Sequence, residues 1–236
     1  MTNLGVGVLL GCHGIISIEV DEDNPVYDSR GNCNAIIETA SNTLIRGCQN
    51  SIPANVTSLG LYAFAGCNAI TIIDIPEGVK TIGEFAFFRC ENLRSVSLPK
   101  SLEEILENAF QSCLSLASIT IPENIIRIGT CALYDCPSLT SIIISASGCS
   151  LANSVFSYKP SDVVLHVQPG LKDSYLTYLE YWDYYNFTVI EDALSGIKAT
   201  KIRNVENSRY YNLAGQPIGK GTKGIVIKNG MKVLLK

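Results

Sequence analysis

The sequence predicts a β-rich solenoid followed by a small C-terminal β-module. The first observation is a unit of 23 residues that occurs four times, without insertion or deletion, between residues 52 and 143. The second is that apolar residues alternate near the end of each unit, as in Val96-x-Leu98, which is typical of a short strand. The third is a proline near the start of every unit, which marks a strand margin because proline cannot donate to a sheet. We therefore expect each unit to form one coil.

Each coil is expected to contain one short strand, at residues 70–75 in the first unit and at equivalent positions in the others. Gly60, Gly83 and Gly129 mark tight corners. The Ala-Phe-x-x-Cys segment that follows each corner is too short for a full helix, so we expect a single helical or 3₁₀ turn there. Stacking then predicts two buried ladders, made by Phe64, Phe87 and Phe110 and by Cys67, Cys90, Cys113 and Cys136.

The unit IPxxVxxIGxxAFxxCxxL resembles the leucine-rich repeats of BspA-like surface proteins of anaerobic bacteria. The resemblance covers about two thirds of the chain. It implies a leucine-rich-repeat right-handed superhelix with short strands and short helical turns. It also implies a bacterial cell-surface or secreted protein that lacks a cofactor and adheres to partner proteins, host extracellular proteins included.

Nine cysteines would ordinarily suggest disulfide bridges. Four of them occupy one repeat position, where a small buried hydrophobe is needed. Neighbouring rungs of a ladder lie somewhat beyond the Cβ separation of about 3.8 Å that a disulfide prefers, and no zinc-type spacing occurs. We therefore expect free thiols and no metal site. Cys33 and Cys48, which flank a predicted hairpin, are the one pair for which a bridge stays an alternative.

The N-terminal residues 2–20 match the repeat at a constant offset of 55, so the chain is expected to begin in the middle of a coil. A rival interpretation takes residues 9–12 as a lipoprotein cleavage box, but residues 1–3 contain no Lys or Arg. The sequence as given shows no export signal, so either an upstream part is missing or this copy stays inside the cell. Residues 21–51 are an insertion with a predicted hairpin, and its acidic run is interpreted as solvated turn carboxylates rather than a calcium loop.

The repeat weakens after residue 143, and solenoids need a cap at such an end. Leu171, Tyr175, Tyr178 and Trp182 share one face of a predicted helix, and residues 187–190 are a predicted closing strand. From residue 192 the chain carries 9 basic and 2 acidic side chains. This tail resembles C-terminal sorting or attachment modules of exported bacterial proteins; a simple β-appendage is the alternative. The predicted domains are a solenoid at 1–167 with the insertion 21–51, a cap at 168–191 and a basic β-module at 192–236.

Catalysis is not predicted. His13 and His166 are the only histidines, and neither lies in a readable nucleophile–base arrangement. The acidic residues Glu103, Glu104 and Glu107 are explained by ion pairs with Lys80, Lys100 and Arg127 on neighbouring coils. The acidic part of the chain carries no basic face for nucleic acid. No apolar segment suggests a transmembrane span.

Binding to a protein partner by a monomer is therefore the predicted function, and a structural spacer or a degenerate copy that binds nothing is the alternative. The first candidate residues are aromatic and lie in two places: Tyr62, Phe85, Phe88 and Tyr134 at the turns, and Tyr178 and Trp182 in the cap. The alternative is a hydroxyl-rich stripe on the outward strand face: Asp74, Ser95, Ser97, Ser118, Thr120 and Ser141.

Overall fold

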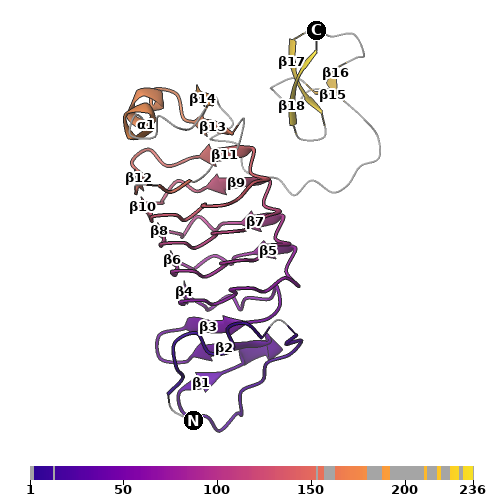
Figure 1. Cartoon of the computed structure of the whole chain (residues 1–236), viewed down its shortest axis with the longest axis vertical. Coiled ribbons are helices and arrows are strands. Elements are labelled where there is room, and N and C mark those ends of the chain that lie inside the picture. Colours follow the sequence, from indigo (N-terminus) through magenta and orange to yellow (C-terminus); the bar gives the residue numbers. More distant parts are fainter. Residues whose placement is uncertain are drawn as a thin grey trace. The chain divides into compact units, whose positions relative to one another are not determined.

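The computed structural model describes residues 3–12, 14–152, 154–156, 163–179, 188–191, 210–211, 217–218, 224–228 and 231–235. The chain divides into two compact units, Met1–Ile197 and Lys198–Lys236. In the larger unit the strands stack one above another along the axis (Figure 1). The predicted β-solenoid is confirmed.

Each full coil contributes two strands, which form two separate columns. The first column is an eight-stranded sheet in the order β1-β2-β3-β4-β6-β8-β10-β12. Its pairs are parallel from β3 onward and antiparallel before it. Its strands are β1 Tyr27–Asp28, β2 Ala35–Glu38, β3 Thr43–Gly47, β4 Ser58–Leu59, β6 Thr81–Ile82, β8 Glu104–Ile105, β10 Arg127–Ile128 and β12 Ser150–Leu151, and a short 3₁₀ segment, η1, spans Arg30–Asn32.

The second column contains the strands that the alternating pattern predicts. It comprises β5 Ile72–Asp74, β7 Ser95–Ser97, β9 Ser118–Ile121, β11 Ser141–Ile144, β13 Val164–Val167 and β14 Thr188–Glu191. Its parallel pairs join residues one repeat apart, such as Ile73 with Val96 and Ile119 with Ile142. Because this register equals the sequence period, equivalent side chains form ladders along the axis.

The turn segment of each coil differs from the expected helical turn. Its i to i−3 hydrogen bonds occur at alternate residues, for example from Ala63 to Gly60 and from Ala65 to Tyr62. The intervening N–H groups of Tyr62 and Phe64 donate to carbonyls of the next coil, at N···O distances of 3.1 and 2.7 Å. In a helical turn every backbone N–H group would donate within the turn itself. In the alternating turns only every second N–H group does so, and the others donate to the next coil.

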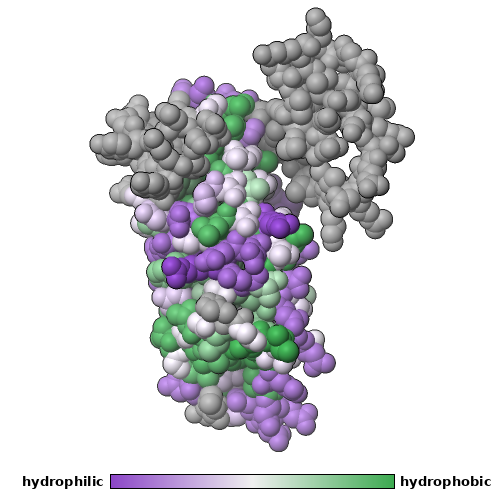
Figure 2. Space-filling model, turned by 45° about the vertical axis from the view of Figure 1, so that its right-hand side comes forward, coloured by the Kyte–Doolittle hydropathy of each residue, from purple (hydrophilic) through white to green (hydrophobic). Residues whose placement is uncertain are grey.

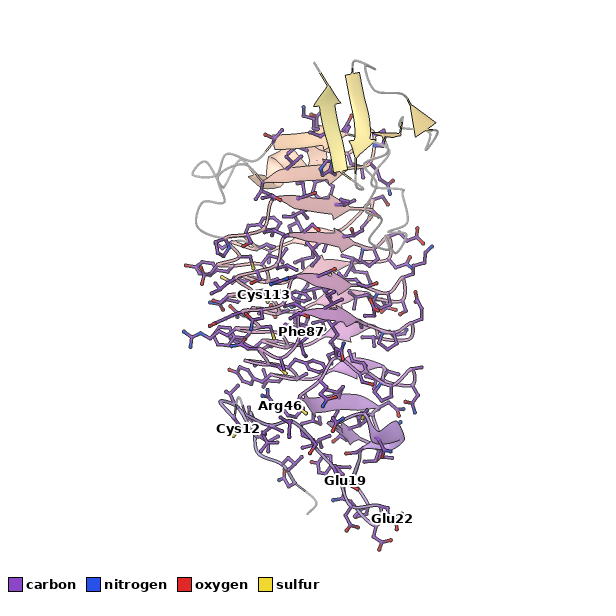
Figure 3. All side chains as sticks on the ribbon, turned by 90° about the vertical axis from the view of Figure 1, so that its right-hand side faces the viewer. Cys12, Glu19, Glu22, Arg46, Phe87 and Cys113 are labelled. Atoms are coloured by element: carbon purple, nitrogen blue, oxygen red, sulfur yellow. The ribbon has the colours of Figure 1, made fainter. Side chains whose placement is uncertain are left out.

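The core lies between the two strand columns and the turns. Figure 3 places Phe87 and Cys113 inside the stack, whereas Glu22 projects from its N-terminal end. The Phe87 ring is fully buried and stacks on Phe64 and Phe110, with ring centroids 5.2 and 5.0 Å apart. The predicted phenylalanine ladder is therefore present, and its one inner ring, Phe87, is covered on both faces.

The cysteine ladder is also present, and its thiols have a specific role. The thiol of Cys113 donates to the carbonyl of Phe87 in the preceding coil, at an S···O distance of 3.3 Å. Cys90 and Cys136 repeat this contact with Phe64 and Phe110 at 3.1 and 3.2 Å. Each thiol thus fills space and weakly satisfies a carbonyl of the previous rung.

The hairpin β2–β3, rather than residues 3–20, occupies the rung before the first full coil. β3 pairs with β4, and the Gly47 N–H donates to the carbonyl of Ala63 at 2.8 Å. Arg46 Nη1 donates to the carbonyls of Tyr62 and Ala65 at 2.9 and 3.0 Å. Axial hydrogen bonds that a preceding coil would supply thus come from the insertion.

The expectation of a coil at residues 2–20 is only partly correct. Residues 5–12 keep the repeat's alternating turns, with N–H donation from Val8 to Gly5 and from Cys12 to Leu9 at 3.2 Å each. No strand forms within residues 14–20. It is β3 of the insertion that pairs with β4, while Gly7 of this segment lies against the Tyr62 ring, where a Cβ on Gly7 would be 3.8 Å from Cδ2.

The C-terminal end of the stack is covered by α1, Lys172–Leu179, and β14. The side chain of Tyr175 is buried, and its hydroxyl donates to the carbonyl of Ala146 at 3.0 Å. The Glu191 carboxylate accepts from the N–H groups of Gly170 and Lys172 at 3.0 and 2.9 Å, so it caps the start of the helix. The predicted helix and closing strand are both present.

The smaller unit contains β15 Tyr210–Tyr211, β16 Pro217–Ile218, β17 Gly224–Lys228 and β18 Met231–Leu235 in the order β16-β15-β17-β18. All of its pairs are antiparallel. β17 and β18 pair along their whole length, and residues 229–230 between them lie outside the described residues.

Candidate functional site

Three aromatic side chains and one arginine lie together on the turns of the first two full coils. We call Tyr62, Phe85, Phe88 and Arg89 the aromatic turn cluster. Tyr62 stacks on Phe85 with centroids 5.0 Å apart, and Phe85 meets Phe88 edge to face at 5.6 Å. The Arg89 guanidinium lies 5.6 Å from the centre of the Phe88 ring, within the range of a cation–π contact. Sequence reasoning identified the three rings but missed Arg89.

The backbone of the turns explains why the rings meet. Tyr62 and Phe85 occupy equivalent repeat positions, and both have left-handed backbone angles, with φ of 59° and 54°. The N–H of Phe85 donates to the carbonyl of Glu107 in the next coil at 3.0 Å. A bulky residue rarely adopts this conformation. Because stacking one repeat apart superposes these positions, the second ring lies over the first.

The three rings of the cluster are half-buried, because they cover one another, whereas Arg89 is exposed. Tyr134 is also half-buried but takes part in none of the ring contacts found among the described residues. Tyr178 lies in α1, and Trp182 lies outside the described residues. Of the four predicted turn aromatics, Tyr62, Phe85 and Phe88 are therefore in contact with one another.

The alternative stripe lies on the outward face of the second column. In β5 and β7 the outer residues are exposed while Ile73 and Val96 point into the core. Ser118 is exposed, and Thr120 and Ser141 are half-buried. The stripe presents small hydroxyl groups and the Asp74 carboxylate. These groups offer little area for the large buried contacts that dominate protein interfaces.

The N-terminal end of the solenoid also carries exposed apolar side chains. In Figure 2 apolar surface gathers on the lower half of the stack, and a hydrophilic band lies above it. Five of the most exposed large apolar residues belong to the N-terminal segment and the first full coil: Val6, Leu10, Ile16, Leu61 and Ile72. The Leu61 side chain is 40% exposed beside Tyr62, so it adds apolar area next to the cluster.

The charged residues of the coils form ion pairs between rungs. Lys80 pairs with Glu103 at 3.1 Å and Arg127 with Glu107 at 2.8 Å, as predicted. Lys100 forms its ion pair with Glu123, at 3.0 Å, and not with Glu104. The side chains are about half exposed, and such pairs contribute little.

The acidic run of the insertion forms hydrogen bonds within its own turns. The side chains of Asp21 and Asn24 accept backbone N–H groups two or three residues later, at 3.0 Å. A two-pronged contact with Arg30 lowers the pKa of Asp28 to about 2. Within the described part of the chain, no three His, Cys, Asp or Glu side chains are placed to hold a metal ion.

The thiols are free in all nine cysteines, including Cys33 and Cys48. Burial raises the pKa of Cys90, Cys136 and Cys149 to about 12, so these thiols are protonated and shielded near neutrality. A nucleophilic cysteine needs the opposite environment. Separately, no helix of the described segments is long and apolar enough to cross a membrane.

Comparison with known proteins supports the same architecture. Residues 47–161 match the model of the BspA type leucine rich repeat region, in six copies. The crystal structure of the pneumococcal vaccine antigen PcpA has 22% identity and a TM-score of 0.57, covering 75% of this chain and 50% of PcpA. A leucine rich cell surface protein of Faecalibacterium prausnitzii A2-165 has 26% identity and a TM-score of 0.51, covering 64% of this chain and 44% of that protein. The chain thus spans about half the length of both. No curated protein matches the sequence.

Proposed function

The repeat region, residues 47–161, belongs to the BspA type leucine rich repeat family, and from this premise we propose that the chain is a bacterial surface module that binds a protein partner through the aromatic turn cluster. In this proposal the solenoid is a rigid support without a catalytic step. The buried, protonated thiols and the inter-rung ion pairs are then structural parts of that support.

The contact geometry of the cluster is the observation that carries this proposal. Tyr and Arg are enriched among the residues that dominate interface energies. Here Tyr62, Phe85, Phe88 and Arg89 are held in contact by the turn backbone, so little side-chain entropy is lost on binding. Leu61 extends the apolar area at one side. A partner that presents aliphatic or aromatic side chains with a nearby carboxylate for Arg89 fits this surface.

The cell surface is the proposed location. The similar protein of F. prausnitzii is described as a leucine rich cell surface protein, and the repeats of the present chain are also leucine-rich. The basic β-module at 192–236 is then a sorting or attachment element, as its resemblance implies. The host extracellular proteins to which such modules adhere are the proposed partners.

A photo-crosslinking experiment tests the cluster directly. A photoreactive phenylalanine analogue replaces Tyr62 in one full-length protein and Ser97, on the outward stripe, in another. Each is incubated with host-cell surface proteins, irradiated and analysed by mass spectrometry. We expect a crosslinked partner from position 62 and none from position 97. The same purified partner must then bind the unmodified chain with measurable affinity.

A matched set of variants gives the second readout. Replacing Phe85 and Phe88 by serine should weaken binding of that partner at least tenfold, whereas replacing Ser95 and Ser97 by alanine should leave it unchanged. Circular dichroism and thermal unfolding of both variants check that the coils remain intact. Crosslinks from position 97 alone would place the contact on the stripe. Unchanged binding by the serine variant would refute the role of the cluster. No crosslink at all would also refute it and would favour the alternative that the chain is a structural spacer.

A further inference from the structure

Arg46 is a buried cation without a matching negative charge. Its side chain extends from β3 and the residue is 4% exposed. Nη1 is satisfied by the carbonyls of Tyr62 and Ala65, but Nε has no hydrogen-bond partner among the described residues. None of the four ion pairs formed in the described part of the chain includes Arg46. A buried charge of this kind is costly unless an anion compensates for it.

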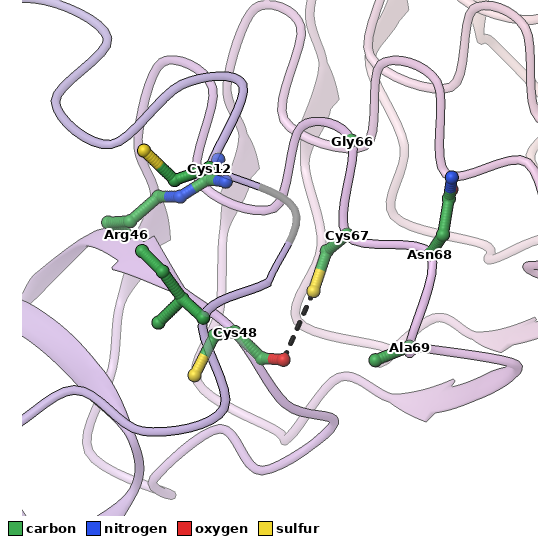
Figure 4. Close-up of a pocket in the computed structure, with 8 residues that line it drawn as sticks. Cys12, Arg46, Cys48, Gly66, Cys67, Asn68 and Ala69 are labelled. Atoms are coloured by element: carbon green, nitrogen blue, oxygen red, sulfur yellow. Dashed lines mark hydrogen bonds between the residues drawn. The ribbon is translucent and has the colours of Figure 1, made fainter.

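A small cavity adjoins the guanidinium. Its volume is about 20 Å³, and its lining consists of Cys12, Ile15, Arg46, Cys48, Gly66, Cys67, Asn68 and Ala69. Figure 4 shows the Arg46 side chain reaching from the strand edge toward Cys12, with Cys48 and Cys67 on the other side of the space. A volume of this size accommodates one water-sized occupant. Polyatomic anions such as sulfate do not fit.

The lining supplies no alternative counter-charge. It contains no Asp or Glu, and the Cys67 thiol is committed as a donor to the carbonyl of Cys48 at 3.1 Å. Burial raises the pKa of the Cys48 and Cys67 thiols, so both are neutral near pH 7. Among the described residues, the polar groups around the space are the guanidinium with its free N–H, the Asn68 amide, whose oxygen accepts from the Glu91 N–H at 3.0 Å, and weakly polar sulfur atoms.

We propose that this cavity is a binding site for one small monovalent anion of the halide class, with chloride as the expected ligand and Arg46 Nε as its principal donor. The guanidinium charge attracts the anion, the unpaired N–H gives it a directed hydrogen bond, and the cavity volume selects against larger anions. Since Arg46 also holds the turn at Tyr62, the anion stabilises the junction between the hairpin and the first full coil.

Bromide diffraction and chloride titration test the site on the full-length wild-type protein. Crystals soaked in sodium bromide should show an anomalous peak within hydrogen-bond distance of Arg46 Nε. In solution, the urea-unfolding equilibrium is measured in chloride and in methanesulfonate at equal ionic strength. Each tenfold rise in chloride above the dissociation constant should lower the unfolding constant about tenfold, whereas methanesulfonate should have no such effect.

Two variants provide the controls. Arg46→Met should lose both the peak and the chloride dependence, and Arg127→Met, which removes a half-exposed guanidinium paired with Glu107, should retain both. If Arg46→Met does not fold, the wild-type peak and the contrast between the two anions decide the question. No bromide peak at Nε, or equal effects of chloride and methanesulfonate in the wild type, would overturn the proposal.

Discussion

Replacing Phe87 by alanine should destabilise the solenoid strongly. The Phe87 side chain is fully buried, and both faces of its ring are covered by stacked partners at 5.2 and 5.0 Å. Removal of such a ring costs about 3–5 kcal/mol through lost burial and the cavity left behind. Each aromatic pair adds about 0.5–1.5 kcal/mol, so the loss should lie near the upper end of that range.

Urea unfolding followed by circular dichroism measures this loss. The matched core variant is Phe110→Ala: Phe110 stacks on Phe87, but the next rung on its other side carries Leu133. Its loss should be smaller than that of Phe87→Ala by about one aromatic pair, or 0.5–1.5 kcal/mol. Ser97→Ala, on the outward face, should stay within about 0.5 kcal/mol of the wild type. Equal losses for Phe87→Ala and Ser97→Ala would show that the inward and outward faces have been assigned the wrong way round.

Three further predictions concern the thiols and the corners of the coils. The pKa values of Cys90, Cys136 and Cys149 rise from 9.0 to about 12 on folding. Their stabilising contribution is therefore complete below pH 9 and is lost as the pH rises toward 12, by about 1.4 kcal/mol per thiol for each pH unit. Unfolding curves at pH 8 and pH 10 check this, and a Cys90→Ala variant with an unchanged pH slope would contradict it. Thiol labelling without reductant should modify Cys67, Cys90, Cys113 and Cys136 only after denaturation; a mass spectrum that links any two of them would disprove the free ladder. Gly83→Ala should destabilise by about 1–3 kcal/mol, because its Cβ would lie 2.5 Å from the carbonyl oxygen of Leu59; calorimetry that finds no loss would show that the coils can move apart there.

The strands of the second column and the hairpin strands β2 and β3 were predictable, whereas the two-residue strands of the first column were not. In β7, for example, Val96 lies between Ser95 and Ser97, and this pattern also gives the correct inward face. A two-residue strand such as β4 or β6 contains one buried apolar residue and shows no period. Its strand conformation depends on hydrogen bonds to the neighbouring coils, and these become visible only when the coils are stacked.

The candidate surfaces show the same difference between composition and contact. Tyr62 and Phe85 can be identified as turn aromatics because the repeat fixes their equivalent positions. Their stacking depends on left-handed backbone angles, which sequence alone suggests for Gly or Asn rather than for Tyr or Phe. The role of Arg46 was likewise hidden, because an arginine in a hairpin strand is ordinarily solvent-exposed. The sequence feature that could have indicated this role is the glycine next to it, Gly47. A side chain at position 47 would clash with the Phe64 ring, which shows how closely this part of β3 approaches the first full coil.

At the N-terminal end of the stack, an arginine side chain donates the hydrogen bonds that backbone N–H groups of another coil would otherwise donate, and this affects whether solenoids can associate end to end. A stack of coils whose last carbonyls are free can be lengthened by any strand that offers N–H groups, and such growth leads to fibres. At the N-terminal end of this stack the carbonyls of Tyr62, Ala63 and Ala65 already accept from Arg46 and Gly47. Polymerisation through this face would first require a second molecule to displace a charged, forked side chain. The hairpin thus blocks the addition of further coils at the N-terminal end of the solenoid.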